Sequence, residues 1–439
     1  MIYRLKRWSA ALLLGMFLSL LSILQCFAAG TVSQVNLHIG QTPDAVYLTY
    51  SAPDAVQEAF SVTGPKGTAD YAANPVWSDS AGKYLYSAKV DGLAPDTNYT
   101  YNIAGSYSGT FKTPAETGAF TFAFLTDTQI GFEADAKATG AMFSLLNSRD
   151  DLAFAYIAGD MTDSSRNERQ WEMLFENGGV NSGAGQTFFG SHLIAAAQGN
   201  HDNSSFSGHI TAPCANSGVG PVVYSFDYSN VKFVVLNMNN PGTWAAQADF
   251  LRQQAADAKN NGKWLVACFH QSLYSAGAAH IVDYGIISAR KFWSPLFAEL
   301  GVDLVLQGHD HVYARGFVTS TGSNANLTAE NNTYHVVSGI PLYITGGHSG
   351  AVKWYAARNY QISAGDPLTP NYSFLDVNSA ASAQNPWGTD TSKTHEQSYI
   401  LINVNGDTMT ISTYMFRYDG ISDKMATPPY LYDSLTISR

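Results

Sequence analysis

The stretch Thr121–Gln129, TFAFLTDTQ, decides the fold of this 439-residue chain. Apolar, strand-forming residues run up to Asp127, where polar side chains begin. Four later stretches repeat this pattern, each ending in side chains that can bind a metal ion: FAYIAGD (154–160), LIAAAQGNHD (193–202), WLVACFH (264–270) and VDLVLQGHDH (302–311). Such apolar runs are typical of strands covered on both faces. Because ligands gather beyond the carboxyl ends of strands in α/β sheets, we expect the five ends to meet.

The surrounding sequence, residues 118–346, alternates strand and helix patterns and predicts an α/β domain. The candidate helices cover residues 134–147, 167–177, 244–260 and 289–299. Further strands are expected at Thr187–Phe189, Val222–Tyr228 and Val231–Asn237. In the C-terminal extension, residues 347–439, the stretch 350–395 has the composition of a surface excursion. It is followed by a predicted hairpin of Tyr399–Val404 and Thr408–Tyr414, which we expect to extend a sheet of the α/β domain.

Residues 31–114 predict a small all-β domain. Alternating patterns mark strands at Val46–Tyr50 and Tyr84–Val90. The segment Leu93–Tyr99 resembles the corner of a fibronectin type III sandwich, where a tyrosine hydroxyl ties the backbone. The domain carries no cluster of titratable residues. We therefore expect a spacer or a binding module, with a cell-surface or sugar partner as one possibility.

Residues 1–28 have the pattern of a signal peptide. A basic start with Arg4, Lys6 and Arg7 precedes the apolar run Leu12–Leu24. The run is too short and wrongly flanked for a stable membrane span. We expect the protein to be secreted or otherwise extracytoplasmic, with the periplasm and the cell surface left open. Cleavage would move the net charge from −11 to −14, which disfavours binding to nucleic acid or anionic membrane.

Two cysteines, Cys214 and Cys268, remain after the predicted signal peptide. Two cysteines do not make a disulfide framework. Cys268 lies on a buried-looking strand, so we interpret it as an inert thiol. A Cys214–Cys268 bridge is the alternative.

The strand ends predict a metal centre. Carboxylate oxygens, an amide oxygen and imidazole nitrogens suit divalent or trivalent ions. The candidate ligands are Asp127, Asp160, Asn200, His270, His309 and His311. These are more ligands than one ion usually needs, so two ions sharing a bridging carboxylate are expected, an arrangement used to hydrolyse phosphate esters. Burying these charges without a cation would be very costly.

The order of the five clusters resembles the calcineurin-like metallophosphoesterase superfamily. With a fibronectin-like domain ahead of them, the chain is most similar to the purple acid phosphatase branch. The resemblance implies a four-layer αββα sandwich and two ions bridged by Asp160. The other ligands would divide between the ions: Asp127 and His311 on the first, and Asn200, His270 and His309 on the second.

Two histidines beyond the ligands are expected to act on the substrate. The resemblance implies that His201 contacts the phosphate and protonates the leaving oxygen, beside Asn200. His280 matches a second substrate-facing histidine, although an exposed loop position is the alternative. Asp202 is expected either to orient His201 or to cap the following loop. The remaining histidines are expected to be structural or exposed, with His348 the one nearest the site.

Two positions depart from the pattern of purple acid phosphatases and their relatives. Asp163 stands where those phosphatases place an iron-binding tyrosine, three residues after the bridging Asp160. Gln129 stands where the wider superfamily often has a histidine. Gln129 could bind the first ion or only support its ligands, and we favour support. Without the tyrosine the two ions could be Fe, Zn or Mn, because ligand type alone does not choose among them.

These features predict a phosphatase that hydrolyses a small phosphomonoester with a hydroxide held by the two ions and with His201 as general acid. A phosphodiesterase or nucleotidase on the same ions is the alternative within enzymes. A non-catalytic secreted binding protein would be expected to have lost ligands, and none is lost. A protein with structural metals would have closed coordination, without an open water position.

Overall fold

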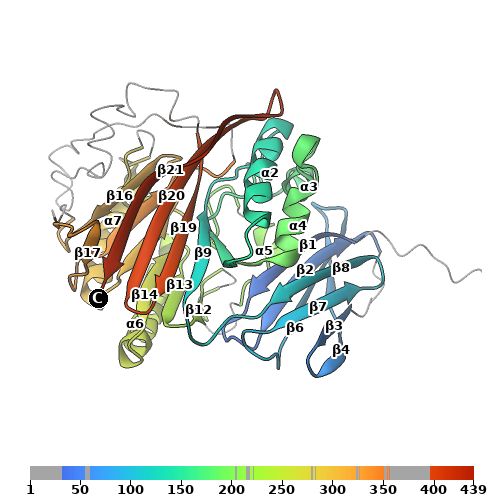
Figure 1. Ribbon diagram of the computed structural model, residues 1–439, viewed down its shortest axis with the longest axis horizontal. Coiled ribbons are helices and arrows are strands. Elements are labelled where there is room, and N and C mark those ends of the chain that lie inside the picture. Colours follow the sequence, from blue (N-terminus) through green and yellow to red (C-terminus); the bar gives the residue numbers. More distant parts are fainter. Residues whose placement is uncertain are drawn as a thin grey trace, which may run out of the picture.

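The computed structural model describes residues 32–54, 60–202, 205–213, 218–220, 222–277, 280–281, 283–322, 325, 327–350, 353, 355 and 396–439. The predicted signal peptide, Cys214 and most of residues 350–395 lie outside these ranges. Within the ranges, no helix combines the length and the apolar character that crossing a membrane requires. The described chain forms three sheets with flanking helices (Figure 1).

The largest sheet has eleven strands in the order β17-β21-β20-β19-β9-β10-β11-β1-β2-β6-β5. Its parallel centre consists of β9 (Phe120–Leu125), β10 (Leu152–Ile157) and β11 (Leu193–Ala196). Beside β9 lie β19 (Gln397–Asn405), β20 (Thr408–Asp419), β21 (Lys424–Ser438) and β17 (Thr333–His335). The predicted C-terminal hairpin is therefore confirmed, and it extends the central sheet.

The second sheet has six strands in the order β12-β13-β14-β15-β18-β16. Its strands are β12 (Tyr224–Tyr228), β13 (Val231–Val235), β14 (Trp264–Cys268), β15 (Leu304–Gln307), β18 (Leu342–Gly346) and β16 (Tyr313–Phe317). The four strands β13, β14, β15 and β18 are parallel, and the two edge strands run antiparallel to them.

The two large sheets pack against each other through aromatic side chains. Phe154 makes edge-to-face contacts with Phe226 and Phe233, at ring-centre distances of 5.6 and 5.4 Å. Alternate residues of β9 divide between the two faces of the sheet. Phe122 and Phe124 face the sandwich core, and the intervening Ala123 lies in the core under the helices. Burial on both faces explains the continuous apolar runs.

Helices cover the outer faces of the sandwich. On the large sheet lie α2 (Glu133–Asn147), α3 (Glu168–Glu176) and α4 (Ala184–Ser191) (Figure 1). The six-stranded sheet is covered by α6 (Trp244–Asn260) and α7 (Tyr284–Leu300). Short helices are η1 (Gly179–Asn181), α5 (Phe206–His209) and η3 (Pro241–Thr243). The layers therefore confirm the expected αββα architecture.

The N-terminal region is all β, as expected. The strands β1 (Ser33–Ile39), β2 (Val46–Ala52), β6 (Lys83–Val90) and β5 (Asn74–Ser78) belong to the large sheet. The third sheet consists of β4 (Gly67–Tyr71), β3 (Phe60–Gly64), β7 (Asn98–Ile103) and β8 (Tyr107–Lys112). The Tyr99 hydroxyl accepts a hydrogen bond from the Ala94 amide at 2.8 Å, so the predicted tyrosine tie is present. Because β1 pairs with β11, the sheet continues across the domain boundary predicted near residue 114.

One predicted strand is wrong. Thr187–Phe189 lies in α4, not in a strand. Phe188 and Phe189 both pack on Phe143 of α2, at ring-centre distances of 4.7 and 5.1 Å. Consecutive aromatic residues raise the strand propensity, but helix-to-helix packing overrides it here. The helix predicted at 289–299 is also longer, because α7 begins at Tyr284.

Cys268 is fully buried at the end of β14 and forms no disulfide with a described residue, while Cys214 lies outside the described ranges. Burial raises the pKa of its thiol well above the usual range. A thiol that stays protonated is unreactive, so the interpretation of Cys268 as an inert buried residue is confirmed.

Candidate metal centre

The strand ends meet between the two large sheets. Asp127, Asp160 and Asn200 follow β9, β10 and β11 of one sheet, and His270 and His309 follow β14 and β15 of the other. Hydrogen bonds join these ends: the Asp127 amide donates to the Gly159 carbonyl at 3.1 Å, and the Gly308 amide to the His270 carbonyl at 2.8 Å. The site is therefore assembled by the sandwich itself.

Three side chains converge on His270. Its Nε2 atom lies 3.1 Å from Asn200 Oδ1, 3.1 Å from Asp160 Oδ2 and 3.2 Å from His309 Nδ1. One ligand atom each from Asp160, His270 and His309 lie within 4.8 Å of one another. These are the four residues expected on the second ion, and their donor atoms are close enough to bind one cation together.

Asp127 and His311 form a second, adjoining pair. Asp127 Oδ1 lies 3.2 Å from His311 Nε2, and both side chains are almost completely buried. The other oxygen, Asp127 Oδ2, accepts hydrogen bonds from the Thr126 hydroxyl and from the His309 amide at 2.8 Å. Oδ1 accepts no hydrogen bond from any residue that the structure describes. A buried carboxylate oxygen without a donor fits a position that faces a cation.

Backbone carbonyls fix the orientation of two ligand histidines. His270 Nδ1 lies 2.7 Å from the Ala158 carbonyl oxygen, and His311 Nδ1 lies 2.7 Å from that of Lys353. A carbonyl oxygen only accepts, so Nδ1 carries the proton in both rings. In each ring Nε2 is therefore the nitrogen that faces the site, the usual arrangement of metal-binding histidines.

The charges around Asp160 also indicate a cation. Burial opposes ionisation of this carboxylate, but neighbouring His270 lowers the pKa of Asp160 below its usual range. Burial alone would lower the pKa of His270, yet the Asp160 and Asp127 charges raise it to about 10. Burial and the adjacent His270 and His280 hold the pKa of His309 well below its usual range, so His309 is neutral. A metal ion can take the place of the His270 proton.

The ligand segments are strained. Four ligands have left-handed backbone conformations, with φ values of 51° at Asp127, 48° at Asp160, 74° at His309 and 50° at His311. This conformation costs residues with a side chain about 1–2 kcal/mol each, and such strain gathers at functional sites. His309 and His311 therefore reach their partners from a bent segment.

Glycines before the ligands are required by close approach. A Cβ atom on Gly199 would lie 2.0 Å from Asp160 Oδ1, and one on Gly308 would lie 1.9 Å from Thr126 Oγ1. Gly159 has a φ of 92°, and a Cβ there would meet the backbone of Gly199. These positions therefore need glycine, because a side chain would collide with the neighbouring ligand segments.

His201 lies at the mouth of the centre, with 27% of its side chain exposed. Its amide donates to Asp160 Oδ1 at 2.8 Å, and its Nδ1 lies 2.6 Å from the Asp163 carbonyl oxygen. Its Nε2 lies 3.1 Å from Gln129 Nε2, and Gln129 Nε2 also donates to Asp163 Oδ1 at 3.0 Å. The two departures from the family pattern therefore meet each other beside His201.

Asp202 supports the ligand segments. Its carboxylate is fully buried and accepts from the amides of Met161 at 3.0 Å and Gly199 at 3.2 Å. Burial and the Asp160 charge raise the pKa of Asp202 to about 7. Its bonds thus tie together the turns that carry Asp160 and Asn200, and they replace the expected contact with His201.

His280 borders the centre, on the side of His309. The two rings lie 4.2 Å apart between centres, and His280 Nδ1 lies 3.0 Å from Asp283 Oδ2. About a quarter of the His280 side chain is exposed. Its position is compatible with the substrate-facing role, and Asp283 restricts its orientation.

Tyr355 is a neighbour of the centre that sequence reasoning missed. Its ring lies 4.8 Å from that of His311 and 5.2 Å from that of His280. Burial raises the pKa of its hydroxyl. Tyr355 falls in the stretch interpreted as a surface excursion, and no local pattern distinguishes it from the other tyrosines.

The other described histidines lie apart from the ligands, with one partial exception. His38 is buried against Tyr224, 3.1 Å from its hydroxyl, and burial lowers the pKa of His38 to about 4. His348 approaches most closely, with its ring 5.8 Å from that of His311. The structural interpretation of these residues agrees with their positions.

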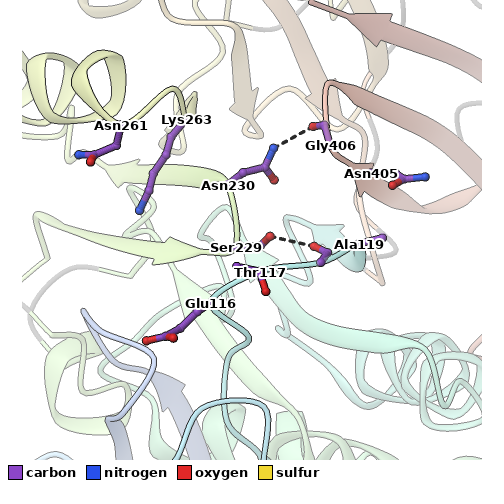
Figure 2. Close-up of a pocket in the computed structure, with 10 residues that line it drawn as sticks. Glu116, Thr117, Ala119, Ser229, Asn230, Asn261, Lys263, Asn405 and Gly406 are labelled. Atoms are coloured by element: carbon purple, nitrogen blue, oxygen red, sulfur yellow. Dashed lines mark hydrogen bonds between the residues drawn. The ribbon is translucent and has the colours of Figure 1, made fainter.

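A polar cavity of about 410 Å³ lies at the opposite edge of the sheets (Figure 2). Glu116 and Lys263 line it just before β9 and β14. Asn230 and Asn405 line it from the turns before β13 and β20. Asn230 donates to the Gly406 carbonyl at 2.8 Å, and Ser229 donates to that of Gly118 (Figure 2). None of the predicted site residues lines this cavity.

An αββα sandwich with these candidate ligands at its strand ends is the arrangement expected of a metallophosphoesterase. Residues 120–313 match the family model described as calcineurin-like phosphoesterase. The chain therefore carries a domain of this family, and the resemblance to the superfamily is confirmed.

Relatives place the domain near the purple acid phosphatases. The chain is 23% identical over 303 residues to phosphoenolpyruvate phosphatase of Allium cepa, covering 65% of this chain and 61% of the relative. It is 24% identical over 298 residues to Fe(3+)-Zn(2+) purple acid phosphatase 12 of Arabidopsis thaliana, covering 61% and 59%. The chain thus spans about three fifths of the length of these relatives.

A solved structure confirms the fold. Purple acid phosphatase PPD1 from yellow lupin (Lupinus luteus) seeds superimposes with a TM-score of 0.68. The superposition covers 93% of this chain and 75% of the lupin chain, at 15% sequence identity. The shared fold therefore includes the N-terminal β region as well as the sandwich.

Proposed function

We propose that this protein is an exported phosphatase that hydrolyses phosphomonoesters at a pair of metal ions. The convergence of Asp160, Asn200, His270 and His309 beside Asp127 and His311 carries the proposal. The names of its onion and Arabidopsis relatives, both phosphatases, support the same chemistry.

The ligand set fits two cations. Asp127 and His311 would hold the first, Asn200, His270 and His309 the second, and Asp160 both. When bound, such ions polarise phosphate oxygens and make a water molecule reactive near neutral pH. The Arabidopsis relative is named for iron and zinc, but Asp163 replaces the iron-binding tyrosine here. Fe, Zn and Mn therefore remain candidates.

His201 is the proposed proton donor to the leaving oxygen. In the structure its Nδ1 proton is held by the Asp163 carbonyl, and Nε2 accepts from the Gln129 amide. Protonation of Nε2 breaks this contact, because the Gln129 amide nitrogen cannot accept. The Nε2 proton is then available for transfer to the leaving oxygen, while the Nδ1 hydrogen bond to the Asp163 carbonyl holds the ring in place.

Asn200, His201 and His280 are the proposed substrate contacts. Asn200 is exposed at the mouth of the centre, and His280 lies on the His309 side. His201 and His280 thus present ring nitrogens from two segments that come from different sheets. Donors fixed in this way can stabilise charge that develops on the phosphoryl oxygens. This mechanism uses no protein nucleophile.

The remaining assignments rest on the sequence. We propose export, based on the pattern of residues 1–28, and a fibronectin type III-like sandwich within residues 31–114. The catalytic domain would cover 118–346, followed by the extension 347–439. The Tyr99 tie supports the sandwich assignment. A cell-surface or sugar partner for this region stays a prediction.

The comparison of wild type with His201→Ala tests the function. We expect two ions per chain in both proteins by elemental analysis. On an alkyl phosphate, the variant should lose about 10²–10⁴-fold in kcat. The loss should be smaller on a nitrophenyl phosphate, whose leaving group needs no proton.

His335→Ala, at an exposed histidine on β17, is the matched control and should leave kcat unchanged. Phosphodiesters in the same panel separate the two substrate classes. A wild-type protein that holds two ions but hydrolyses no phosphoester would contradict the proposal.

A further inference from the structure

Gln129 is a buried amide beside the metal centre. Its side chain is 3% exposed, and its backbone has a left-handed φ of 34°, like the ligand Asp127 two residues earlier. The amide nitrogen donates to Asp163 Oδ1 at 3.0 Å and lies 3.1 Å from His201 Nε2. Because the side chain is enclosed, the nitrogen and the oxygen of this amide both need a hydrogen-bonding or charged partner.

The neighbours of Gln129 fix which way its amide points. A carboxylate oxygen such as Asp163 Oδ1 only accepts hydrogen bonds. His201 Nδ1 donates to the Asp163 carbonyl, which leaves Nε2 as an acceptor as well. Two acceptors require the Gln129 nitrogen to face them, so Oε1 must point the other way.

Gln129 Oε1 is buried and accepts no hydrogen bond from the described residues. Asp127 Oδ1 is the second such oxygen on the same short segment. Two buried oxygens without donors, both on residues held in strained conformations, each call for a positive partner. Carboxylate and amide oxygens both bind divalent ions.

We propose that Gln129 Oε1 is a ligand of the first ion, beside Asp127 and His311, and that Gln129 Nε2 links this ligand to His201 and Asp163. The inference rests on the proposed two-ion centre and deepens it. It replaces the prediction that Gln129 only supports other ligands. The Gln129 side chain would then contact both the first ion and the ring of the proposed proton donor.

Metal binding by Gln129 variants tests the assignment. We expect Gln129→Leu to keep one ion at wild-type affinity and to bind the other at least about tenfold more weakly, measured by equilibrium dialysis with Zn²⁺ or Mn²⁺. Gln129→His offers a ring nitrogen in place of Oε1, so it should restore the second ion. Thermal unfolding of the metal-free proteins checks that each variant folds.

Asp163→Asn is the matched control, since it changes the other partner of the Gln129 amide and keeps an acceptor oxygen. We expect it to retain both ions at wild-type affinity. The Co²⁺-substituted Gln129→Leu protein should also show a changed visible spectrum, because a ligand is lost, whereas Asp163→Asn should not.

Different outcomes would contradict the Gln129 assignment and the proposed function. If wild type binds two ions and Gln129→Leu binds both equally well, the Gln129 assignment is wrong and the proposed function stands. Equal losses in Gln129→Leu and Asp163→Asn would also overturn it, because the loss would then follow from the Gln129–Asp163 hydrogen bond and not from a bond between Oε1 and the ion. A wild-type protein with one ion or none would contradict the proposed function itself.

Discussion

The two ends of the central strands differ in nearly every physical respect. At the carboxyl ends, buried charged groups crowd together on strained backbone, and Asp160 and His270 lie 3.1 Å apart. At the amino ends, a polar cavity of about 410 Å³ is lined by ordinary turns such as that at Asn230 and Gly406 (Figure 2). The comparison teaches that the presence of a cavity does not by itself locate the chemistry here. Unsatisfied charge and strain do.

The largest effect should come from Asp160, the residue proposed to hold both ions. We expect Asp160→Asn to lower kcat/KM on a phosphomonoester on the order of 10⁴-fold, beyond the 10–100-fold typical of residues that only support ligands. Elemental analysis should show that at least one ion is lost. If Asp160→Asn kept both ions and the wild-type kcat/KM, the chemistry could not be assigned to the carboxyl ends of the strands.

Metal binding should depend on pH through His270. Its pKa is raised to about 10 in the metal-free protein, so binding to Nε2 below that pH must displace a proton. We expect the apparent affinity of the second ion to rise up to about tenfold per pH unit between pH 7 and 9. Calorimetry in buffers of different ionisation heat should show the released proton, and pH-independent binding would contradict this.

The same shift predicts the stability of the metal-free protein. A histidine whose pKa is raised above the unfolded value of 6.5 stabilises the fold fully below that value, and the stabilisation is lost as pH approaches 10. The His270 contribution to the free energy of unfolding should therefore fall by at most about 1.4 kcal/mol per pH unit in this range. Chelator-treated protein should therefore unfold at a lower temperature at pH 9 than at pH 7. Metal-loaded protein should not show this loss of stability, because the ion takes the place of the His270 proton.

Asp202 should affect stability more modestly. In Asp202→Asn one of the two amides now bound by the carboxylate would face an NH₂ group. An unsatisfied buried amide costs about 1–3 kcal/mol. We expect denaturant unfolding to show this loss, together with weaker metal binding, and unchanged stability would mean that Asp202 does not tie the ligand turns.

The smallest effect should come from the opposite edge. Asn230→Ala removes the hydrogen bond to the Gly406 carbonyl, which should cost about 1 kcal/mol of stability. The kcat and metal content should stay at wild-type values. A large loss of activity from this substitution would show that the polar cavity takes part in the chemistry.

Much of the site could be predicted because its residues follow apolar strands. Asp127, Asp160 and His270 stand where β9, β10 and β14 stop, and the glycines before Asp160 and His309 mark the tight turns. The sheet brings such ends together, so order along the chain was enough to group them. The hairpin of β19 and β20 was equally visible from its alternation and its Asn-Gly turn.

Features that depend on packing were not predictable. The stretch containing Tyr355 and the Lys353 carbonyl was judged on composition, which says nothing about contacts with His311. The pairing of β1 with β11 joins segments about 150 residues apart, and α4 was misassigned because its aromatic residues suit a strand equally well. The Gln129–Asp163 contact likewise needed the fold to become visible.

Anomalous diffraction from crystals grown with Mn²⁺ or Zn²⁺ tests the central claim most directly. The account predicts two peaks about 3.5–4 Å apart at the carboxyl ends of β9, β10 and β14, with an Asp160 oxygen touching both. A single peak, or two peaks of which Asp160 touches only one, would contradict it.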